Sequence, residues 1–232
     1  MAITITSTRD AALTQGIKIL VHGPAGSGKT VLASTTGESA IIISAEAGLL
    51  SLRHMDIPVI VVKSLQDVEA AYMKVSEGAD YNWICLDSIS EIAEQVLAYE
   101  MKVTKDPRKA YGELSSQMMD LMRAFRDLPI NVYMSCKQVR VEDDDGRTSY
   151  GPMMPGQKLA QQIPYLFDEV FALRVEKDAE GSPTRWLQTS ADIKYSAKDR
   201  SGVLDLFEPA DLSVIAAKIR QESICDQTTN QE

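Results

Sequence analysis

The 232-residue sequence has little of what marks secreted, metal-binding or membrane proteins. Its three cysteines, Cys85, Cys136 and Cys225, show no metal-ligand spacing. Cys85 and Cys136 lie in apolar stretches, so we expect both to be small core residues. An odd cysteine count and the lack of a signal sequence favour a reducing cytoplasm. No apolar run reaches the roughly 18 residues that a membrane-spanning helix needs, so we expect no membrane partner.

The sequence is also short of positive charge. It carries 24 Lys and Arg against 33 Asp and Glu, a net charge of -9. Such a chain is not expected to coat nucleic acid through bulk charge, although a local basic loop can still contact it. The length fits one domain, and 44% hydrophobic residues suffice for its core. We expect this domain at 15–220, after an N-terminal arm or edge strand at 1–14 and before a flexible tail at 221–232.

One stretch, residues 23–30, fits the pattern G-x-x-x-x-G-K-[ST] of a phosphate-binding loop. An apolar run at 17–21 precedes it as a predicted strand, and a predicted helix follows. A loop in this position can turn backbone N–H groups towards a phosphate. Lys29 is predicted to reach the β- and γ-phosphates, and the Thr30 hydroxyl to hold Mg²⁺. The alternative is a tight structural turn. The predicted nucleotide-binding residues are Gly23, Pro24, Ala25, Gly26, Ser27, Gly28, Lys29, Thr30 and Val31.

Short apolar runs alternate with helical patterns along the chain. The predicted buried strands cover 17–22, 40–44, 58–63, 83–86 and 130–135. Helices are predicted after the first strand to about 36, after Ser64, after Ser88, at 110–127, at 158–167 and from Pro209 to about 220. This alternation predicts an α/β fold whose mainly parallel sheet has helices on both faces. Two later segments, 169–176 and 185–189, predict an antiparallel extension at one edge of the sheet.

Polar side chains follow three of these strands, at the edge where open α/β sheets bind ligands. Asp87 is predicted to hold Mg²⁺; the alternative is a helix N-cap, a role that Ser88 could take instead. Glu46 is predicted to activate or orient the attacking water, rather than to be a surface residue at a helix start. Gln138 either senses the γ-phosphate and reports it to the following loop, or is an ordinary polar strand end.

Together with the phosphate loop, the stretches 40–48, 83–88 and 132–138 resemble the ATPase core of RecA-type recombinases. The resemblance covers roughly residues 15 to 210 and is closest to the short, core-only phage single-strand annealing ATPases. It implies a RecA-like P-loop NTPase core that binds ATP and Mg²⁺. It also implies action on single-stranded DNA as a homo-oligomer, a ring or a filament, in the bacterial host cytoplasm. A single-strand binding protein or a nuclease is a candidate partner. The large flanking domains of full-length RecA are missing, which favours annealing over strand exchange.

The resemblance also implies roles for charged residues outside the phosphate loop. In RecA-like ATPases the neighbouring subunit supplies cations to the γ-phosphate, and here the candidates are Lys198 and Arg200. The alternative is a solvated charged turn. Two segments would face DNA: a basic stretch at 102–111 and the stretch at 139–156 after Gln138, which is either a hairpin tip or a mobile loop and whose acidic run at 142–145 would repel phosphates. Charged helix ends are usually just solvated, which is the alternative for the first segment. The candidate DNA-contacting residues are Lys102, Lys105, Arg108, Lys109, Tyr111, Arg140, Arg147 and Lys158.

Three other classes of protein stay open. A small-molecule P-loop kinase would need an acceptor site and a basic lid, which the acidic run at 142–145 disfavours. An AAA-type ATPase for assembly or remodelling would carry a helical lid domain, whereas a single predicted helix follows Pro209. Asp87 is also followed by Ser88 rather than by a second acid. A nucleotide-dependent scaffold would hydrolyse ATP poorly, which Glu46 disfavours. The lack of a guanine-reading Asn-Lys-x-Asp motif mildly favours ATP over GTP.

Overall fold

The computed structural model describes residues 5–8, 15–37, 39–46, 48–78, 80–142, 145–177 and 180–228. The strands are β1 (Lys18–Gly23), β2 (Ala40–Ser44), β3 (Val59–Val61), β4 (Trp83–Asp87), β5 (Asn131–Glu142), β6 (Thr148–Pro152), β7 (Glu169–Lys177), β8 (Pro183–Gln188), β9 (Lys198–Asp199) and β10 (Phe207–Pro209). The helices are α2 (Lys29–Ala33), α3 (Leu65–Ser76), α4 (Ile89–Val103), α5 (Pro107–Arg126), α6 (Gln157–Gln162) and α7 (Leu212–Thr228). Short 3₁₀ turns are η1 (Ser34–Thr36), η2 (Gly48–Leu52) and η3 (Ile163–Leu166).

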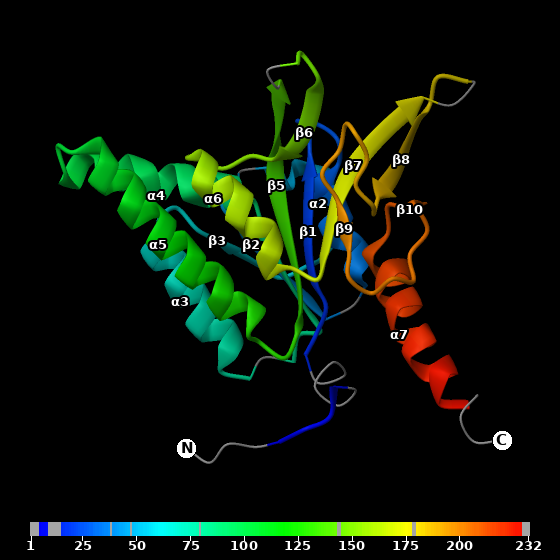
Figure 1. Cartoon of the computed structure of the whole chain (residues 1–232). Helices are drawn as coiled ribbons and strands as arrows, with labels where there is room; N and C mark the ends of the chain where they lie inside the picture. Colours follow the sequence, from blue (N-terminus) through cyan, green and yellow to red (C-terminus); the bar gives the residue numbers. More distant parts are fainter. Residues whose placement is uncertain are drawn as a thin grey trace.

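One sheet organises the molecule, with the strand order β10-β8-β7-β1-β5-β4-β2-β3 (Figure 1). From β7 to β3 all neighbouring strands are parallel. The strands β8, β9 and β10 pair antiparallel beyond them, and β6 forms an antiparallel hairpin with β5. The predicted fold class is therefore confirmed: an α/β fold with a mainly parallel sheet and an antiparallel edge extension. Because β5 lies between β1 and β4, it passes directly beside the end of β1, where the phosphate loop begins.

Both faces of the sheet are covered, as predicted (Figure 1). The core on one face packs side chains of α3, α4, α5 and α6 against strand residues such as Leu20 and Leu86. The core on the other face packs α2 and α7 against residues such as Val21 and Tyr133. Cys85 and Cys136 are buried free thiols, which confirms the prediction for them. Within the described residues, no helix is long and apolar enough to span a bilayer.

The prediction for the end of β5 is wrong in a way that matters for function. The strand does not stop near Ser135 but continues to Glu142, and its second half pairs with β6. Residues 139–142 alternate apolar and charged side chains, which is the period of a strand. Gln138 consequently lies inside a strand that leaves the sheet, and of the two forms expected for the stretch after it, a hairpin tip or a loop, the structure shows the hairpin.

The predicted basic loop at 102–111 is mostly helical, because α4 ends at Val103 and α5 begins at Pro107, which leaves 104–106 as the connection. Whether its lysines and arginine contact DNA stays a prediction. The side chain of Asp106 accepts a hydrogen bond from the Arg108 N–H, which makes it the N-cap of α5. Pro107 takes the first helical position, where its missing N–H is tolerated. Asp106-Pro107 therefore begins a helix, which extends the predicted range of 110–127 backwards.

The predicted C-terminal boundary of the domain differs from the structure, whereas most of the segment before the N-terminal boundary is not described. The backbone of α7 continues to Thr228, beyond the predicted limit near 220, and no glycine or proline interrupts 212–228. The tail predicted at 221–232 is therefore helical over most of its length, and 229–232 lie outside the described residues. The N-terminal arm predicted at 1–14 also lies outside the described residues, except for 5–8.

Candidate nucleotide-binding site

The phosphate loop connects β1 to α2 at the carboxyl edge of the parallel strands. Gly26 and Gly28 have φ angles of 74° and 104°, in the left-handed region that glycine adopts without strain. A Cβ on Gly23 would lie 2.8 Å from the Ser27 Oγ. That Ser27 hydroxyl is buried and makes no hydrogen bond within the described residues. An unpaired buried hydroxyl is costly, so this cradle fits a bound group that supplies the missing partner.

Lys29 bends over the loop. Its Nζ donates to the Gly23 carbonyl at 2.8 Å and to the Pro24 carbonyl at 2.9 Å. Burial lowers the pKa of Lys29, against the opposing effect of Glu46 and Asp87. A phosphate oxygen is a stronger partner for an ammonium than a neutral carbonyl, because the hydrogen bond is then charge-assisted on both sides. Lys29 is thus held where a phosphate could replace its present acceptors.

Thr30 and Asp87 meet beside the loop. The Thr30 hydroxyl donates to the Asp87 Oδ2 at 2.6 Å, and the Ser135 hydroxyl donates to the other carboxylate oxygen. Asp87 is buried. Mg²⁺ takes oxygen ligands, few of them from protein and the rest from phosphates and water. A hydroxyl and a carboxylate in contact therefore fit a magnesium ion that is shared with a nucleotide.

Glu46 lies at the same edge, next to the end of β4. Its Oε1 accepts a hydrogen bond from the Ser88 hydroxyl, and its N–H donates to the Asp87 carbonyl at 3.3 Å. The Ser88 Oγ also accepts from the Glu91 N–H at 3.3 Å and so caps α4. The cap is thus formed by Ser88, and Asp87 is left to Thr30 and Ser135.

Gln138 contacts a residue that the sequence analysis missed. Its Oε1 lies 3.3 Å from Nδ1 of His22, the residue before Gly23. His22 is fully buried, and its Nε2 lies 2.7 Å from the Ser196 carbonyl. Burial lowers the pKa of His22. No motif marks this histidine, because its neighbours come from the pairing of β1 with β5 and from a segment far along the chain.

Arg185 is a second residue that the sequence analysis missed. It lies on β8, and its Nε donates to the Ser27 carbonyl at 2.9 Å. A Cβ on Gly28 would come within 2.9 Å of the same nitrogen. The antiparallel extension of the sheet thus holds the phosphate loop from one side. The two partners lie 158 positions apart, so no local pattern could have revealed the contact.

The predicted trans cations lie at the other edge of the sheet. Strand β9 pairs with the start of β7, with Asp199 opposite Glu169, and Glu169 lies beside Ile19 near the start of β1. Lys198 and Arg200 are therefore at the amino edge of the parallel strands, opposite the phosphate loop. Both side chains contact groups that precede β7, at Pro164, Phe167 and Asp168, rather than the phosphate loop.

Both cations have partners at that edge. The Lys198 Nζ donates to the Pro164 carbonyl at 2.8 Å and to the Phe167 carbonyl. Arg200 forms an ion pair with Asp168 at 2.8 Å, with the arginine side chain 56% exposed. A role in hydrolysis by a neighbouring subunit stays a prediction for these two residues.

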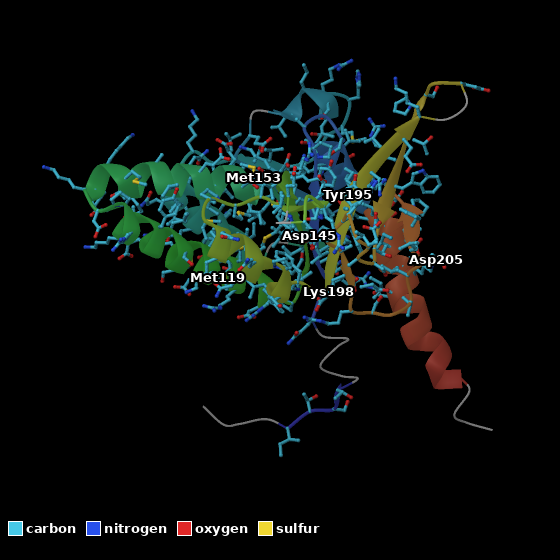
Figure 2. The ribbon with its side chains drawn as sticks, turned by 45° about the horizontal axis from the view of Figure 1, so that its top comes forward. Met119, Asp145, Met153, Tyr195, Lys198 and Asp205 are labelled. Atoms are coloured by element: carbon cyan, nitrogen blue, oxygen red, sulfur yellow. The ribbon has the colours of Figure 1, made fainter. Side chains whose placement is uncertain are left out.

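The predicted DNA-contacting residues fall into three places. Lys102, Lys105, Arg108 and Lys109 lie at the tip of the α4–α5 pair, which projects from the sheet (Figure 1). Tyr111 and Lys158 come together, because they line one groove of about 530 Å³ that also includes Arg123. Arg140 and Arg147 lie on the β5–β6 hairpin, 3.6 Å from Glu142 and 3.9 Å from Asp145. Figure 2 looks towards the end of the molecule that carries the β5–β6 hairpin and labels Asp145.

The fold and the phosphate loop with its Thr30–Asp87 pair define a P-loop ATPase domain. The chain belongs to an AAA domain family, whose model matches residues 15–201. A similar solved structure is the KaiC-like protein PH0186 from the hyperthermophilic archaeon Pyrococcus horikoshii OT3, at a TM-score of 0.49 and 14% identity. That alignment covers 75% of this chain and 77% of the archaeal one. No curated protein matches the sequence significantly.

Proposed function

We propose that this chain is a RecA-like ATPase that hydrolyses ATP with Mg²⁺ and acts on single-stranded DNA as a homo-oligomer, in recombination or annealing of the phage type. The observation that carries the proposal is the convergence of Glu46, Asp87 and Gln138 around the phosphate loop. A loop with a magnesium carboxylate alone would suit any nucleotide binder. The additional carboxylate and amide suit water activation and nucleotide sensing.

Each residue of the site has a distinct task in this mechanism. The loop backbone and Lys29 bind the β- and γ-phosphates. Thr30 and Asp87 would hold Mg²⁺, which would supply positive charge beside the phosphates. Glu46, oriented by Ser88, accepts a proton from the attacking water. Gln138 contacts the γ-phosphate side, and its strand continues directly into the projecting hairpin.

The groove between α5 and the start of α6 supports the DNA part of the proposal. Tyr111 offers an aromatic face that is 42% exposed, and Arg123 and Lys158 line the same groove. Aromatic stacking combined with nearby cations is how single strands are bound without sequence preference. Arg123 is paired with Asp120 in this groove at 3.2 Å, as the hairpin arginines are paired with acidic side chains. The exposed Tyr111 ring beside Lys158 is what makes the groove the preferred contact surface.

Steady-state ATP hydrolysis with and without single-stranded DNA tests the proposal. We expect wild type to be stimulated by DNA, and Lys29→Ala to be inactive in both conditions. Tyr111→Ala and Lys158→Ala should keep basal hydrolysis and lose most of the stimulation. Lys74→Ala removes an exposed lysine from α3 and serves as the matched control, with stimulation retained.

Two results would overturn the proposal. Transfer of phosphate to a nucleoside or another metabolite, without any effect of DNA, would identify a small-molecule kinase. Hydrolysis that responds to a protein substrate and not to DNA would identify an AAA-type remodelling ATPase.

A further inference from the structure

Three segments that are far apart in the sequence meet at the ring of His22. The histidine lies in β1, one residue before the phosphate loop, and has no exposed surface. Gln138 approaches Nδ1 from β5 at 3.3 Å, and the Ser196 carbonyl approaches Nε2 at 2.7 Å from the segment between β8 and β9. The site already described uses Gln138 but gives no task to this buried histidine.

The protonation of His22 decides how the Gln138 amide is turned. Burial lowers the pKa of His22, so the ring is neutral near pH 7 and carries a single N–H. The Ser196 carbonyl can only accept, which puts that hydrogen on Nε2 and leaves Nδ1 as an acceptor. Amide oxygen and nitrogen have nearly the same shape, and only the NH₂ group can donate to Nδ1. The amide is therefore turned so that its NH₂ group, rather than Oε1, takes the position 3.3 Å from Nδ1 and donates to it.

The other partner of His22 belongs to a well-anchored strip, residues 194–196. The Ser196 N–H donates to the Tyr150 carbonyl at 2.9 Å, and the Tyr150 N–H donates to the Lys194 carbonyl at 2.6 Å. The Tyr195 ring stacks on Tyr150, with ring centroids 5.0 Å apart. Figure 2 labels Tyr195 and Lys198, which follow one another closely along this segment. Ser196 lies two residues before Lys198 and four before Arg200, so the strip joins the ring of His22 to both cations along one short piece of chain.

We propose that His22 is a positioning residue that couples Gln138, at the phosphate end of the molecule, to residues 194–200, which carry the candidate trans cations. When a γ-phosphate draws the Gln138 amide away, His22 loses one of its two hydrogen-bond partners. The ring can then shift, and the distance between its Nε2 and the Ser196 carbonyl changes. The coupling rests on Gln138 sensing the nucleotide, which is part of the proposed function, and not on DNA binding.

Amide hydrogen exchange tests the coupling, with and without a non-hydrolysable ATP analogue and Mg²⁺. In wild type we expect the analogue to change exchange both at 23–30 and at 190–202. His22→Phe retains a ring of similar size but neither hydrogen bond. It should keep the protection at 23–30 and lose the change at 190–202. Gln138→Ala breaks the same link from a half-buried position, so it should give the same loss even if the His22 variant does not fold.

Asp192→Ala is the matched control for mere loosening of the segment. The Asp192 Oδ1 accepts from the Lys194 and Tyr195 N–H groups at 2.7 and 2.6 Å. Its loss should speed exchange at 190–202 in both states while keeping the nucleotide-dependent difference. Protection at 23–30 without a change at 190–202 in wild type, or a change that persists in His22→Phe, would overturn the coupling alone. Absence of protection at 23–30 would overturn the proposed function together with it.

Discussion

Glu46 is the residue on which hydrolysis depends most directly in the proposed mechanism. Glu46→Gln keeps the shape of the side chain and removes its ability to accept a proton from water. We expect kcat to fall by roughly 10²- to 10⁴-fold, the usual contribution of a general base. Binding of ATP should change little, because the loop, Lys29 and Thr30 are intact. Steady-state hydrolysis and titration with a fluorescent ATP analogue measure the two effects separately.

The matched control for Glu46 is Glu113→Gln, which removes an exposed carboxylate on α5. This variant should hydrolyse ATP at the wild-type rate. A Glu46→Gln protein that retained most of its kcat would assign water activation to another group. A protein that lost ATP binding as well would indicate that Glu46 supports the loop rather than the chemistry.

Glu169 gives the molecule a pH dependence that is unrelated to hydrolysis. Burial and the neighbouring Asp199 raise the pKa of Glu169 to about 8. A carboxyl with a raised pKa in the folded state stabilises the fold only while it is protonated. Its contribution is therefore complete below the ordinary value of 4.5 and is lost as the pH rises through about 8. The loss is at most about 5 kcal/mol, the free-energy equivalent of that shift.

Urea unfolding at about pH 6 and about pH 9 checks this dependence. Wild type should lose free energy of unfolding between the two conditions. Glu169→Gln cannot ionise and should lose distinctly less. Glu176→Gln, an exposed residue on the same strand, should behave like wild type. Parallel losses in wild type and Glu169→Gln would show that the pH dependence comes from other groups.

Some residues of the site can be recognised from the sequence immediately around them, and others cannot. Lys29 and Thr30 belong to a motif, and Glu46 and Asp87 follow predicted strands directly, so the sequence suffices to select them. His22, Ser135 and Arg185 have no such mark. Their contacts arise when strands far apart in the chain become neighbours, which only the folded sheet establishes.

At the scale of elements, the antiparallel β7–β8 pair does more than extend the sheet. Through Arg185 it contacts the backbone of the phosphate loop at Ser27. Arg185→Ala removes one charge-assisted hydrogen bond at a partly exposed position, which is worth about 1 kcal/mol. We expect KM for ATP to rise about fivefold, with a smaller change in kcat, because the loop is less well ordered before nucleotide binds.

Thr184→Ala, on the neighbouring position of β8, provides the control for Arg185. It should leave KM unchanged. If Arg185→Ala instead lowered kcat at constant KM, the arginine would be acting on the transition state and not on the loop. Initial rates over a range of ATP concentrations distinguish these outcomes.

The longer elements were predictable, but the short strands β6, β9 and β10 were not, nor were the end of β5, the start of α5 and the end of α7. On α5, Leu114, Met118 and Phe125, which recur at helical spacing in the sequence, are all buried. From the local sequence alone, however, Asp106-Pro107 is equally compatible with the end of one helix and the start of the next. The packing of α5 against α4 selects the helix start. The acidic run at 142–145 is typical of a loop. It drew attention away from the alternation of apolar and charged residues at 139–142, which is the pattern of a strand.

At the scale of the whole molecule, the candidate catalytic groups lie on two opposite edges of one sheet. The phosphate loop and Glu46 lie at the carboxyl edge, and Lys198 and Arg200 at the amino edge. A head-to-tail assembly brings the amino edge of one subunit against the carboxyl edge of the next, which is a heterologous interface that forms rings or filaments. Such an assembly would complete each site with residues of two chains.

Mixing two inactive variants tests this arrangement. Lys29→Ala subunits lack phosphate binding and Arg200→Ala subunits lack the trans cation, so each oligomer alone should hydrolyse ATP slowly. In an equal mixture, about one interface in four pairs an intact loop with an intact Arg200 of the neighbour, for random head-to-tail assembly. We therefore expect hydrolysis to recover on mixing. Lys29→Ala mixed with Glu46→Gln should not recover, because both residues belong to the same half of the site. If the first mixture forms joint oligomers and stays inactive, the site is complete within one chain and Arg200 serves only its ion pair with Asp168.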